Sequence, residues 1–309
     1  MAKITIIGGG GGVSKLLYTL RGKEHNLSAI ISMADSGGST GKLRKQYGVS
    51  AVGDLRKSIS ALSQDRETAS IFEERFAGGD LDGHPLGNII LSAAEMKLGS
   101  IQKAVDAVCS MMKTEGKIVP VTETKISLHA EYADGQTINS ESAIDNSKNK
   151  FNIKKIWIEP EAKINAIAEY AIKNSDLIII GPGDFYTSII PNFLVEGVIE
   201  AIKNSSAKVM FIGPLFTKPG ETYTFSANDF VRVIEDYIGK GRIDLIVFND
   251  EKPSQKVMEE YERKDMHIVS APIEKDNRTV SEHLLDNPEA YPLSTALKTA
   301  KIIEDLLER

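Results

Sequence analysis

The 309-residue chain predicts an α/β protein with a mostly parallel, doubly wound sheet and a small antiparallel β insertion. Two observations lead to this fold class. Short apolar or β-branched runs alternate with stretches of helical spacing along most of the chain, the pattern of a parallel sheet covered by helices. Residues 117–158 differ, because strand-like runs follow one another there. We therefore expect a single domain over residues 1–309, with 117–158 as a β insertion or layer within it.

The first half opens with a strand at residues 4–7, which runs into five glycines and then into helical spacing at 13–20. Strand, glycine turn and helix in this order are typical of the opening of a nucleotide-binding unit. A second buried strand is predicted at 27–33, followed by a polar loop at 34–41. Helical patterns then dominate as far as residue 112.

The inserted segment contains three strand-like runs, at 118–121, 124–132 and 153–158. The sequence Ala133-Asp134-Gly135 is a hairpin turn signal. We interpret all three runs as one antiparallel layer between two α/β halves.

The second half returns to alternating strands and helices. Strands are predicted at 177–180, 208–212 and 244–248. The helices expected here include one that Pro191 opens at its first position; together they cover residues 162–173, 191–203, 228–238, 254–263 and 294–308.

Charge and composition exclude several classes of protein. The net charge is −6, but residues 1–57 carry nine basic and three acidic side chains, a net +6 that leaves −12 for the remainder. An acidic chain argues against a nucleic-acid binder. The single Cys109 excludes a disulfide framework. No apolar run is long enough to span a membrane and no signal peptide precedes the first strand, so a cytoplasmic protein is expected.

The glycine turn is the first candidate site. Glycines allow close approach of a phosphate, and the helix behind them presents free N–H groups and a positive dipole end. The pattern matches neither a P-loop nor a dinucleotide fingerprint fully, and a tight turn without a ligand remains the alternative. The expected contacts are Gly8, Gly9, Gly10, Gly11 and Gly12.

Two further polar segments follow in the first half. Asp35 and Ser39 offer oxygens, and Lys42 and Arg44 offer cations, at the carboxyl end of a predicted strand, where α/β sheets bind ligands. The next segment begins a helix and holds Asp54, Arg56 and Lys57. Asp35 and Asp54 are the candidates for a catalytic role or for holding ribose hydroxyls or a metal ion. A solvated loop and solvated surface cations are the competing interpretations.

Three more segments also place polar residues next to the end of a predicted strand or the start of a predicted helix. Asn88 stands before an apolar helix, where a plain helix cap is equally consistent. A buried strand at 177–180 runs into a glycine turn whose residues would line the same sheet edge as the first glycines: Gly183, Tyr186, Thr187, Ser188 and Asn192. Residues 217–222, past another strand, are a sixth candidate loop or a simple turn.

These six segments, in this order, resemble the CofD-like superfamily, and most closely its gluconeogenesis-factor (YvcK-type) branch. The second loop, Asp35-Ser-Gly-Gly-Ser-Thr-Gly-Lys-Leu-Arg44, matches that pattern apart from Ser36, Thr40 and Lys42, where Asp, Ser and Arg are usual. The branch usually has Thr where this chain has Gly11 and Asn where it has Lys57. Tyr186-Thr-Ser-Ile-Ile-Pro-Asn192 and Thr217-Lys-Pro-Gly-Glu-Thr222 match almost residue for residue.

The resemblance implies a three-layer Rossmann-like fold and a nucleotide or nucleotide-sugar ligand. It implies a cytoplasmic UDP-sugar-binding protein that affects cell shape and wall metabolism during gluconeogenic growth, and it suggests a homodimer. An enzyme is the rival: a CofD-like, Mg²⁺-dependent transferase that moves a phospholactyl group from a guanosine-activated donor to a deazaflavin. A nicotinamide-dependent oxidoreductase, with Asp35 on the ribose, is a weaker third hypothesis.

Overall fold

The computed structural model describes residues 1–269 and 277–308. Its centre is a seven-stranded parallel sheet in the order β10-β9-β8-β7-β1-β2-β3. This confirms the predicted α/β class and the mostly parallel sheet. The strands are β1 (Ala2–Gly8), β2 (His25–Ile31), β3 (Lys117–Pro120), β7 (Leu177–Ile180), β8 (Lys208–Ile212), β9 (Leu245–Asn249) and β10 (Thr279–Glu282).

The strand order reverses between β1 and β7. The chain moves outward from β1 through β2 to β3, returns to β7 on the other side of β1, and then moves outward again to β10. Ligands of open α/β sheets bind in the crevice outside the carboxyl ends of the strands at such a reversal. The loops that follow β1 and β7 therefore lie where a ligand is expected.

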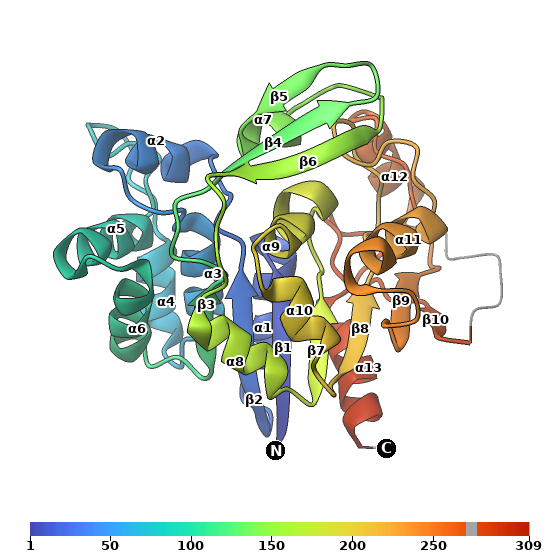
Figure 1. The fold of residues 1–309 in the computed structure, drawn as a ribbon, viewed down its shortest axis with the longest axis horizontal. Helices are drawn as coiled ribbons and strands as arrows, with labels where there is room; N and C mark the ends of the chain where they lie inside the picture. Colours follow the sequence, from blue (N-terminus) through green and yellow to red (C-terminus); the bar gives the residue numbers. More distant parts are fainter. Residues whose placement is uncertain (270–276, 309) are drawn as a thin grey trace.

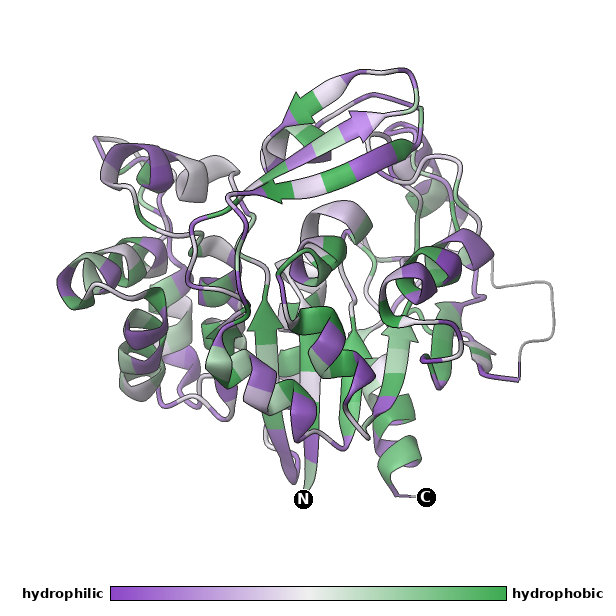
Figure 2. Ribbon diagram, viewed as in Figure 1, coloured by the Kyte–Doolittle hydropathy of each residue, from purple (hydrophilic) through white to green (hydrophobic). Residues whose placement is uncertain are grey.

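Helices cover both faces of the sheet (Figure 1). On one face α1 (Gly10–Leu20) packs against α3 (Gly53–Leu62) and α13 (Ala296–Leu307), and on the other α10 (Val198–Lys203) packs against α8 (Ala166–Lys173) and α11 (Ala227–Ile238). The strands between them are apolar, as Figure 2 shows, and all four residues of β7 are buried. The remaining helices of the main body are α2 (Gly38–Tyr47), α4 (Arg66–Glu73), α5 (Leu86–Leu98), α6 (Ile101–Met112), α9 (Ile190–Phe193) and α12 (Gln255–Glu262).

The insertion is a separate three-stranded antiparallel sheet in the order β5-β4-β6, which lies above the carboxyl edge of the main sheet (Figure 1). It consists of β4 (Ser127–Tyr132), β5 (Thr137–Asn139), β6 (Ile153–Glu159) and the short helix α7 (Glu141–Asp145). The expectation that 118–121 belongs to this layer is wrong, because β3 pairs in parallel with β2. Its apolar run is that of a buried parallel strand.

Three other local predictions need correction. The helix expected at 191–203 is divided into α9 and α10, because Gly197 adopts a left-handed φ of 97° between them, and a π-helix, η1 (Phe185–Ile189), precedes both. The polar loop expected at 34–41 ends early, since α2 begins at Gly38. The short edge strand β10 carries little apolar pattern and was not predicted.

Candidate functional site

The glycine turn after β1 is in direct contact with the turn after β7. A Cβ placed on Gly9 would lie 2.9 Å from Asp54 Oδ2 and 3.5 Å from Ser188 Cβ, and one on Gly183 would lie 3.1 Å from the Gly9 carbonyl oxygen. A Cβ on Gly12 would meet the backbone of Pro182 at 3.1 Å. The glycines thus permit the two halves of the sheet to approach each other at the strand-order reversal.

Asp54, in the first turn of α3, contacts the start of α1. Its Oδ2 accepts a 2.7 Å hydrogen bond from the backbone N–H of Gly10, and its Oδ1 accepts one of 2.9 Å from Lys57 Nζ. Burial lowers the pKa of Lys57, but the charge and hydrogen bond of Asp54, together with the charge of Asp35, raise it, and the net shift is upward. The third predicted segment is therefore joined to the first, with an internal carboxylate at the positive end of α1.

Asp35 lies close to Asp54, at the end of the loop after β2. Burial and the charge of Asp54 raise the pKa of Asp35, against hydrogen bonds from the Gly37 amide and the Thr40 hydroxyl that lower it. A Cβ on Gly53 would lie 2.6 Å from Asp35 Oδ2. The glycine that precedes Asp54 thus allows the two aspartates to share one region.

The predicted cations of the first half have mostly internal partners. Arg44 donates to the carbonyl oxygens of Asp35 at 2.7 Å and Ile126 at 2.6 Å, which ties the β2 loop to the start of the insertion. Arg56 is buried, with its Nε 3.1 Å from Glu73 Oε1. Lys42 is exposed on α2. The basic first segment therefore presents fewer free cations to a ligand than its charge suggests.

Ser39 and Asn88 are brought together, with His84 as a third member. Ser39 Oγ lies 2.8 Å from His84 Nδ1 and accepts a 3.0 Å hydrogen bond from Asn88 Nδ2. Asn88 Oδ1 is buried without a hydrogen-bond partner among the residues described. This group joins the start of α2 to the start of α5.

Of the predicted residues after β7, Gly183 and Ser188 lie at the glycine turn, and Ser188 Oγ would be 3.5 Å from a Cβ on Gly10. The other three have internal roles. Tyr186 packs among aromatic rings that include Phe225, Thr187 donates to Glu221 at 3.2 Å, and the fully buried Asn192 donates to the Ser188 carbonyl at 2.9 Å. These side chains shape the loop rather than face the crevice.

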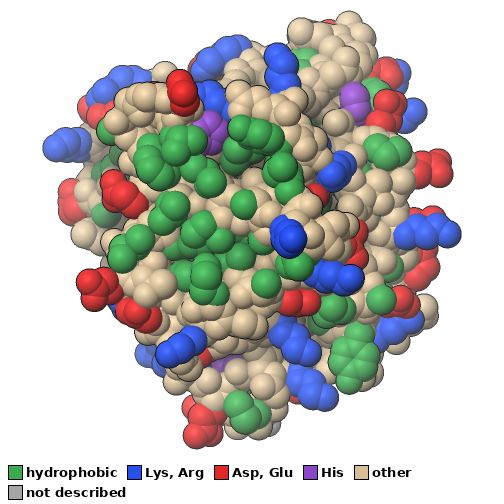
Figure 3. Space-filling view, turned by 90° about the vertical axis from the view of Figure 1, so that its left-hand side faces the viewer, with side chains coloured by type: hydrophobic (Ala, Val, Ile, Leu, Met, Phe, Trp, Pro, Cys, Tyr) green, Lys and Arg blue, Asp and Glu red, His purple; other side chains and the backbone are tan. Residues whose placement is uncertain are grey.

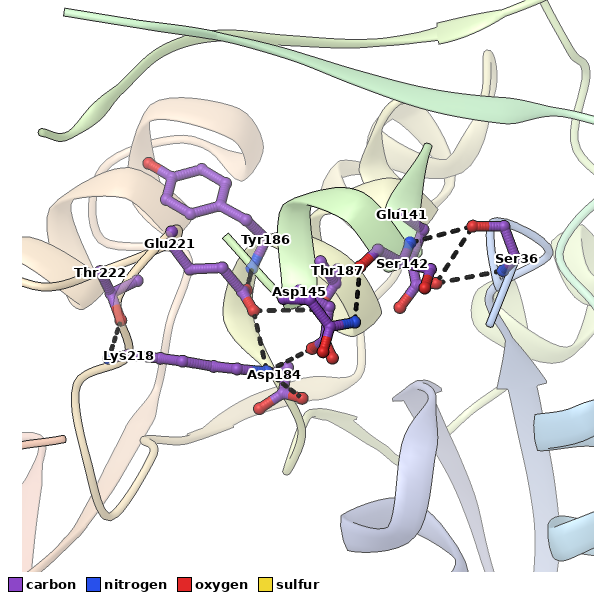
Figure 4. A network of polar contacts seen from close by, with 12 residues as sticks. Ser36, Glu141, Ser142, Asp145, Asp184, Tyr186, Thr187, Lys218, Glu221 and Thr222 are labelled. Carbon is purple, nitrogen blue, oxygen red and sulfur yellow. Dashed lines mark hydrogen bonds and ion pairs between the residues drawn. The ribbon is translucent and has the colours of Figure 1, made fainter. Parts of the chain in front are cut away.

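Lys218 is the centre of a polar network that single residues of the sequence did not reveal (Figure 4). Its ammonium group contacts Asp145 from α7, Asp184 Oδ2 at 3.2 Å and Glu221 Oε1 at 3.4 Å. The three carboxylates lie close enough together to hold a metal ion, and Lys218 lies among them. The motif at 217–222 was the available signal, but a plain turn explained it equally well.

The same helix α7 also contacts the β2 loop. Glu141 Oε2 accepts a 3.0 Å hydrogen bond from the Ser36 N–H, and Ser36 Oγ accepts one of 2.9 Å from the Ser142 N–H (Figure 4). Burial, and then the charge of Asp35, raise the pKa of Glu141 to about 8. The insertion is thus bonded to loops of both halves of the sheet.

A cavity of about 300 Å³ opens beside the start of α1. Gly11, Gly12 and Lys15 form one side of it. The opposite wall includes Phe216 and Tyr261, whose rings stack with centroids 3.8 Å apart and planes 9° apart. The sequence did not predict this wall, because its members come from separate segments without a shared motif.

Comparisons with known proteins agree with this architecture. The family profile described as 2-phospho-L-lactate transferase CofD matches residues 4–286. The chain belongs to the CofD family. Within that family it is 36% identical to the gluconeogenesis factor of Bacillus subtilis, over 99% of this chain and 98% of the relative. It is 41% identical to the gluconeogenesis factor of Listeria innocua, over 80% of this chain and 77% of the relative.

A solved member of similar shape is protein BH3568 from Bacillus halodurans. It matches this chain with a TM-score of 0.93 and 32% identity, over 98% of this chain and 99% of that one. The resemblance to the CofD family and to gluconeogenesis factors is therefore confirmed. No helix in the described parts of the chain is long and apolar enough to cross a membrane.

Proposed function

We propose that this CofD-family protein binds a nucleotide sugar, of the UDP-sugar type, at the strand-order reversal. The observation that supports this most is the cavity beside Gly11 and Gly12. It combines a helix N-terminus, which favours phosphate, with a stacked aromatic wall, against which a nucleobase can pack.

The diphosphate would lie over the first turn of α1. The first N–H groups of a helix have no partner within it, and Asp54 uses only that of Gly10. Lys15 is exposed on the same helix, lines the cavity and has no ion pair among the described residues. It is therefore the best-placed cation for the phosphates, and the base would lie toward Phe216 and Tyr261.

A divalent cation fits the acidic side of this site. Asp184 lines the cavity, and Asp35 and Asp54 lie close to each other beside the start of α1, so a diphosphate bound here would need a positive charge between its phosphates and these carboxylates. Carboxylate and phosphate oxygens are the ligands that Mg²⁺ prefers. Asp35 and Asp54 are the residues we propose to hold it, and it would neutralise the charge of the phosphates.

The cellular role that we propose follows from the resemblance. The named relatives are gluconeogenesis factors. We propose that this protein likewise acts in the cytoplasm and links nucleotide-sugar levels to cell shape and wall metabolism during gluconeogenic growth. The family description favours a second candidate, a phospholactyl transferase that uses a guanosine-activated donor.

Thermal stability in the presence of ligands separates these functions. UDP-sugars, GDP and NADP would be titrated with and without Mg²⁺, because a ligand at a hundredfold excess over its dissociation constant stabilises by about 2.7 kcal/mol. A shift with UDP-sugars supports the proposal, and its absence overturns it. A Mg²⁺-dependent shift with GDP alone favours the transferase, and a shift with NADP alone favours the oxidoreductase.

Variants locate the binding site. Lys15→Glu should weaken UDP-sugar binding at least tenfold, whereas Lys45→Glu, a matched change on exposed α2, should leave it unchanged. Tyr261→Leu retains apolar volume but removes the aromatic ring, and should weaken binding of the nucleoside more than that of free diphosphate. Equal effects of the two lysine variants would place the ligand elsewhere.

A further inference from the structure

Strand β6 is an outer strand of the inserted sheet, and one of its edges has no partner strand. The sheet has the order β5-β4-β6, so among the described residues β6 pairs with β4 alone. It is seven residues long, as long as β1 and β2 in the main sheet. A free edge of this length is a template for pairing with another chain, and proteins usually shorten or cover such edges.

The register of the inserted sheet shows which backbone groups of β6 face the free edge. The Leu128 carbonyl accepts a 2.8 Å hydrogen bond from the residue that follows β5, so Leu128 turns its backbone groups toward β5. Backbone direction alternates along a strand, so His129 turns toward β6, where it pairs with Trp157. The N–H and C=O groups of Ile156 and Ile158 then point outward, and they make no hydrogen bond within the described residues.

A groove of about 650 Å³ lies along this free edge. One side of the groove is β6, and the other is α10 with the end of α9 (Figure 1). Its lining includes the apolar side chains of Ile156, Phe193, Leu194 and Ile199. A strand added in this groove has both a backbone to pair with and an apolar surface for alternate side chains.

The border of the groove is acidic. Four glutamates and one cation line it: Glu159, Glu161, Glu196, Glu200 and Lys155. All four glutamates are exposed, and Glu161 and Glu200 have no ion pair within the described residues. Four carboxylates around one groove favour a ligand with positive charge.

The shape of this surface differs from that of a broad apolar face. Around α5, hydrophobic side chains spread over a wide area of the molecule (Figure 3). The groove instead follows a single strand, with outward backbone groups at every second residue of β6. This geometry suits an extended segment of chain rather than the surface of a folded domain.

We propose that the groove binds an extended, basic segment of a partner protein, which adds to β6 as a fourth strand of the inserted sheet. The backbone of the segment pairs with Ile156 and Ile158, and its lysine or arginine side chains face the four glutamates. A segment of alternating basic and apolar residues fits, because successive side chains of a strand point to opposite faces. This proposal is independent of the nucleotide site, which lies beside the start of α1.

A synthetic heptapeptide of alternating lysine and valine, blocked at both ends, tests the proposal. Trp157 is the single tryptophan of the chain and lines the groove, so its fluorescence reports binding. The peptide should bind at least about tenfold more tightly than a matched peptide with glutamate in place of lysine, and added salt should weaken it. No fluorescence change up to about 1 mM lysine peptide, or equal binding of the two peptides, would overturn the proposal.

Charge-reversal variants locate the bound peptide. Glu161→Lys with Glu200→Lys should weaken binding at least about tenfold, because both carboxylates border the groove. Glu262→Lys with Glu308→Lys makes the same change of net charge at exposed residues outside the groove, and should bind the peptide as the wild type does. Equal losses in the two double variants would mean attraction to the chain as a whole, and would overturn the assignment to this groove.

N-methylated peptides test strand addition without any change to the protein. In an extended peptide the N–H groups of the lysines point to one side and those of the valines to the other. Methylation of the set that faces β6 should abolish binding, whereas methylation of the set that faces away should leave it largely unchanged. Equal binding of the two methylated peptides would mean that the backbone does not pair, and would rule out the added strand.

Discussion

The carboxylate of Asp54 accepts a 2.7 Å hydrogen bond from the backbone N–H of Gly10. The residue that begins the third motif thus holds the first turn of α1, which belongs to the first motif. Asp54 also pairs with Lys57. One carboxylate oxygen therefore contacts the start of α1, and the other contacts the ammonium group of Lys57. The two motifs, more than forty residues apart in the sequence, form one structural unit.

Removal of this carboxylate should destabilise the protein. Asp54→Ala leaves a backbone donor and the ammonium of Lys57 without their acceptor, which should lower the free energy of unfolding by about 1–3 kcal/mol. Asp54→Asn retains an acceptor and should cost less. Urea unfolding of the ligand-free protein measures both, with the exposed Asp236→Ala as control. Equal stability of Asp54→Ala and the control would contradict this role.

Neighbouring glycines of the first turn should respond in opposite ways. A Cβ on Gly11 meets nothing within 4 Å, whereas one on Gly12 meets the Pro182 backbone at 3.1 Å. Gly11→Ala should therefore stabilise by about 0.5–1 kcal/mol, through reduced backbone entropy of the unfolded chain. Gly12→Ala should destabilise, because backbone atoms must move. Thermal melting of the two variants gives the comparison.

The open space at Gly11 also fits the Thr that is usual in the resembling branch. Gly11→Thr adds a hydroxyl at the start of α1, which should strengthen diphosphate binding several-fold, by about 1 kcal/mol. Gly11→Ala is the matched control without the hydroxyl. If both variants bind diphosphate equally, the hydroxyl makes no contact and the phosphates lie elsewhere.

Glu141 should make stability depend on pH. Its folded pKa is about 8, raised from 4.5 by burial and by Asp35. Between about pH 4.5 and 8 the unfolded chain releases this proton while the folded protein keeps it, so stability falls as the pH rises. Glu141→Gln removes this contribution and should be more stable than the wild type at pH 8–9, with a smaller difference near pH 4. The exposed Glu161→Gln should follow the wild type.

Lys218 should be essential to the network that it centres. Lys218→Met leaves Asp145, Asp184 and Glu221 without their shared cation, and should cost about 3 kcal/mol or more. The three carboxylates could then accept a divalent cation instead. Denaturation in EDTA and in Mg²⁺ distinguishes the two states: Mg²⁺ should recover part of the loss in the variant. A variant as stable as the wild type in EDTA would contradict this role.

The main sheet could be predicted from the sequence because its strands are short, apolar and separated by helices. β7 occupies the predicted residues 177–180 without change. The assignment of β3 failed because an apolar run does not reveal its neighbour. Pairing with β2 is decided by the helices that return the chain to the sheet edge, which local patterns do not contain.

The sequence predicts which loops form the candidate site, but not which partners their side chains contact. The sequence singles out the glycines and Asp54 as candidates, since glycine runs and helix starts have local signals. The internal partners of Arg44 and Asn192 could not be, because they depend on which backbone carbonyls lie nearby after folding. The cavity wall at Tyr261 depends in the same way on contacts between distant segments.

The attachments of helix α7 restrict how the β insertion can move relative to the main sheet. It is five residues long, yet it is bonded to Ser36 beyond β2 and to Lys218 beyond β8. A ligand that widens the gap between the two halves of the sheet must break one of these attachments. If the bond to Ser36 breaks, the insertion remains held on the β8 side, where the Tyr132 hydroxyl also donates a 2.6 Å hydrogen bond to the Gly220 carbonyl oxygen. Trp157, the single tryptophan of the chain, lies in this insertion, so its fluorescence gives a direct way to observe such a movement.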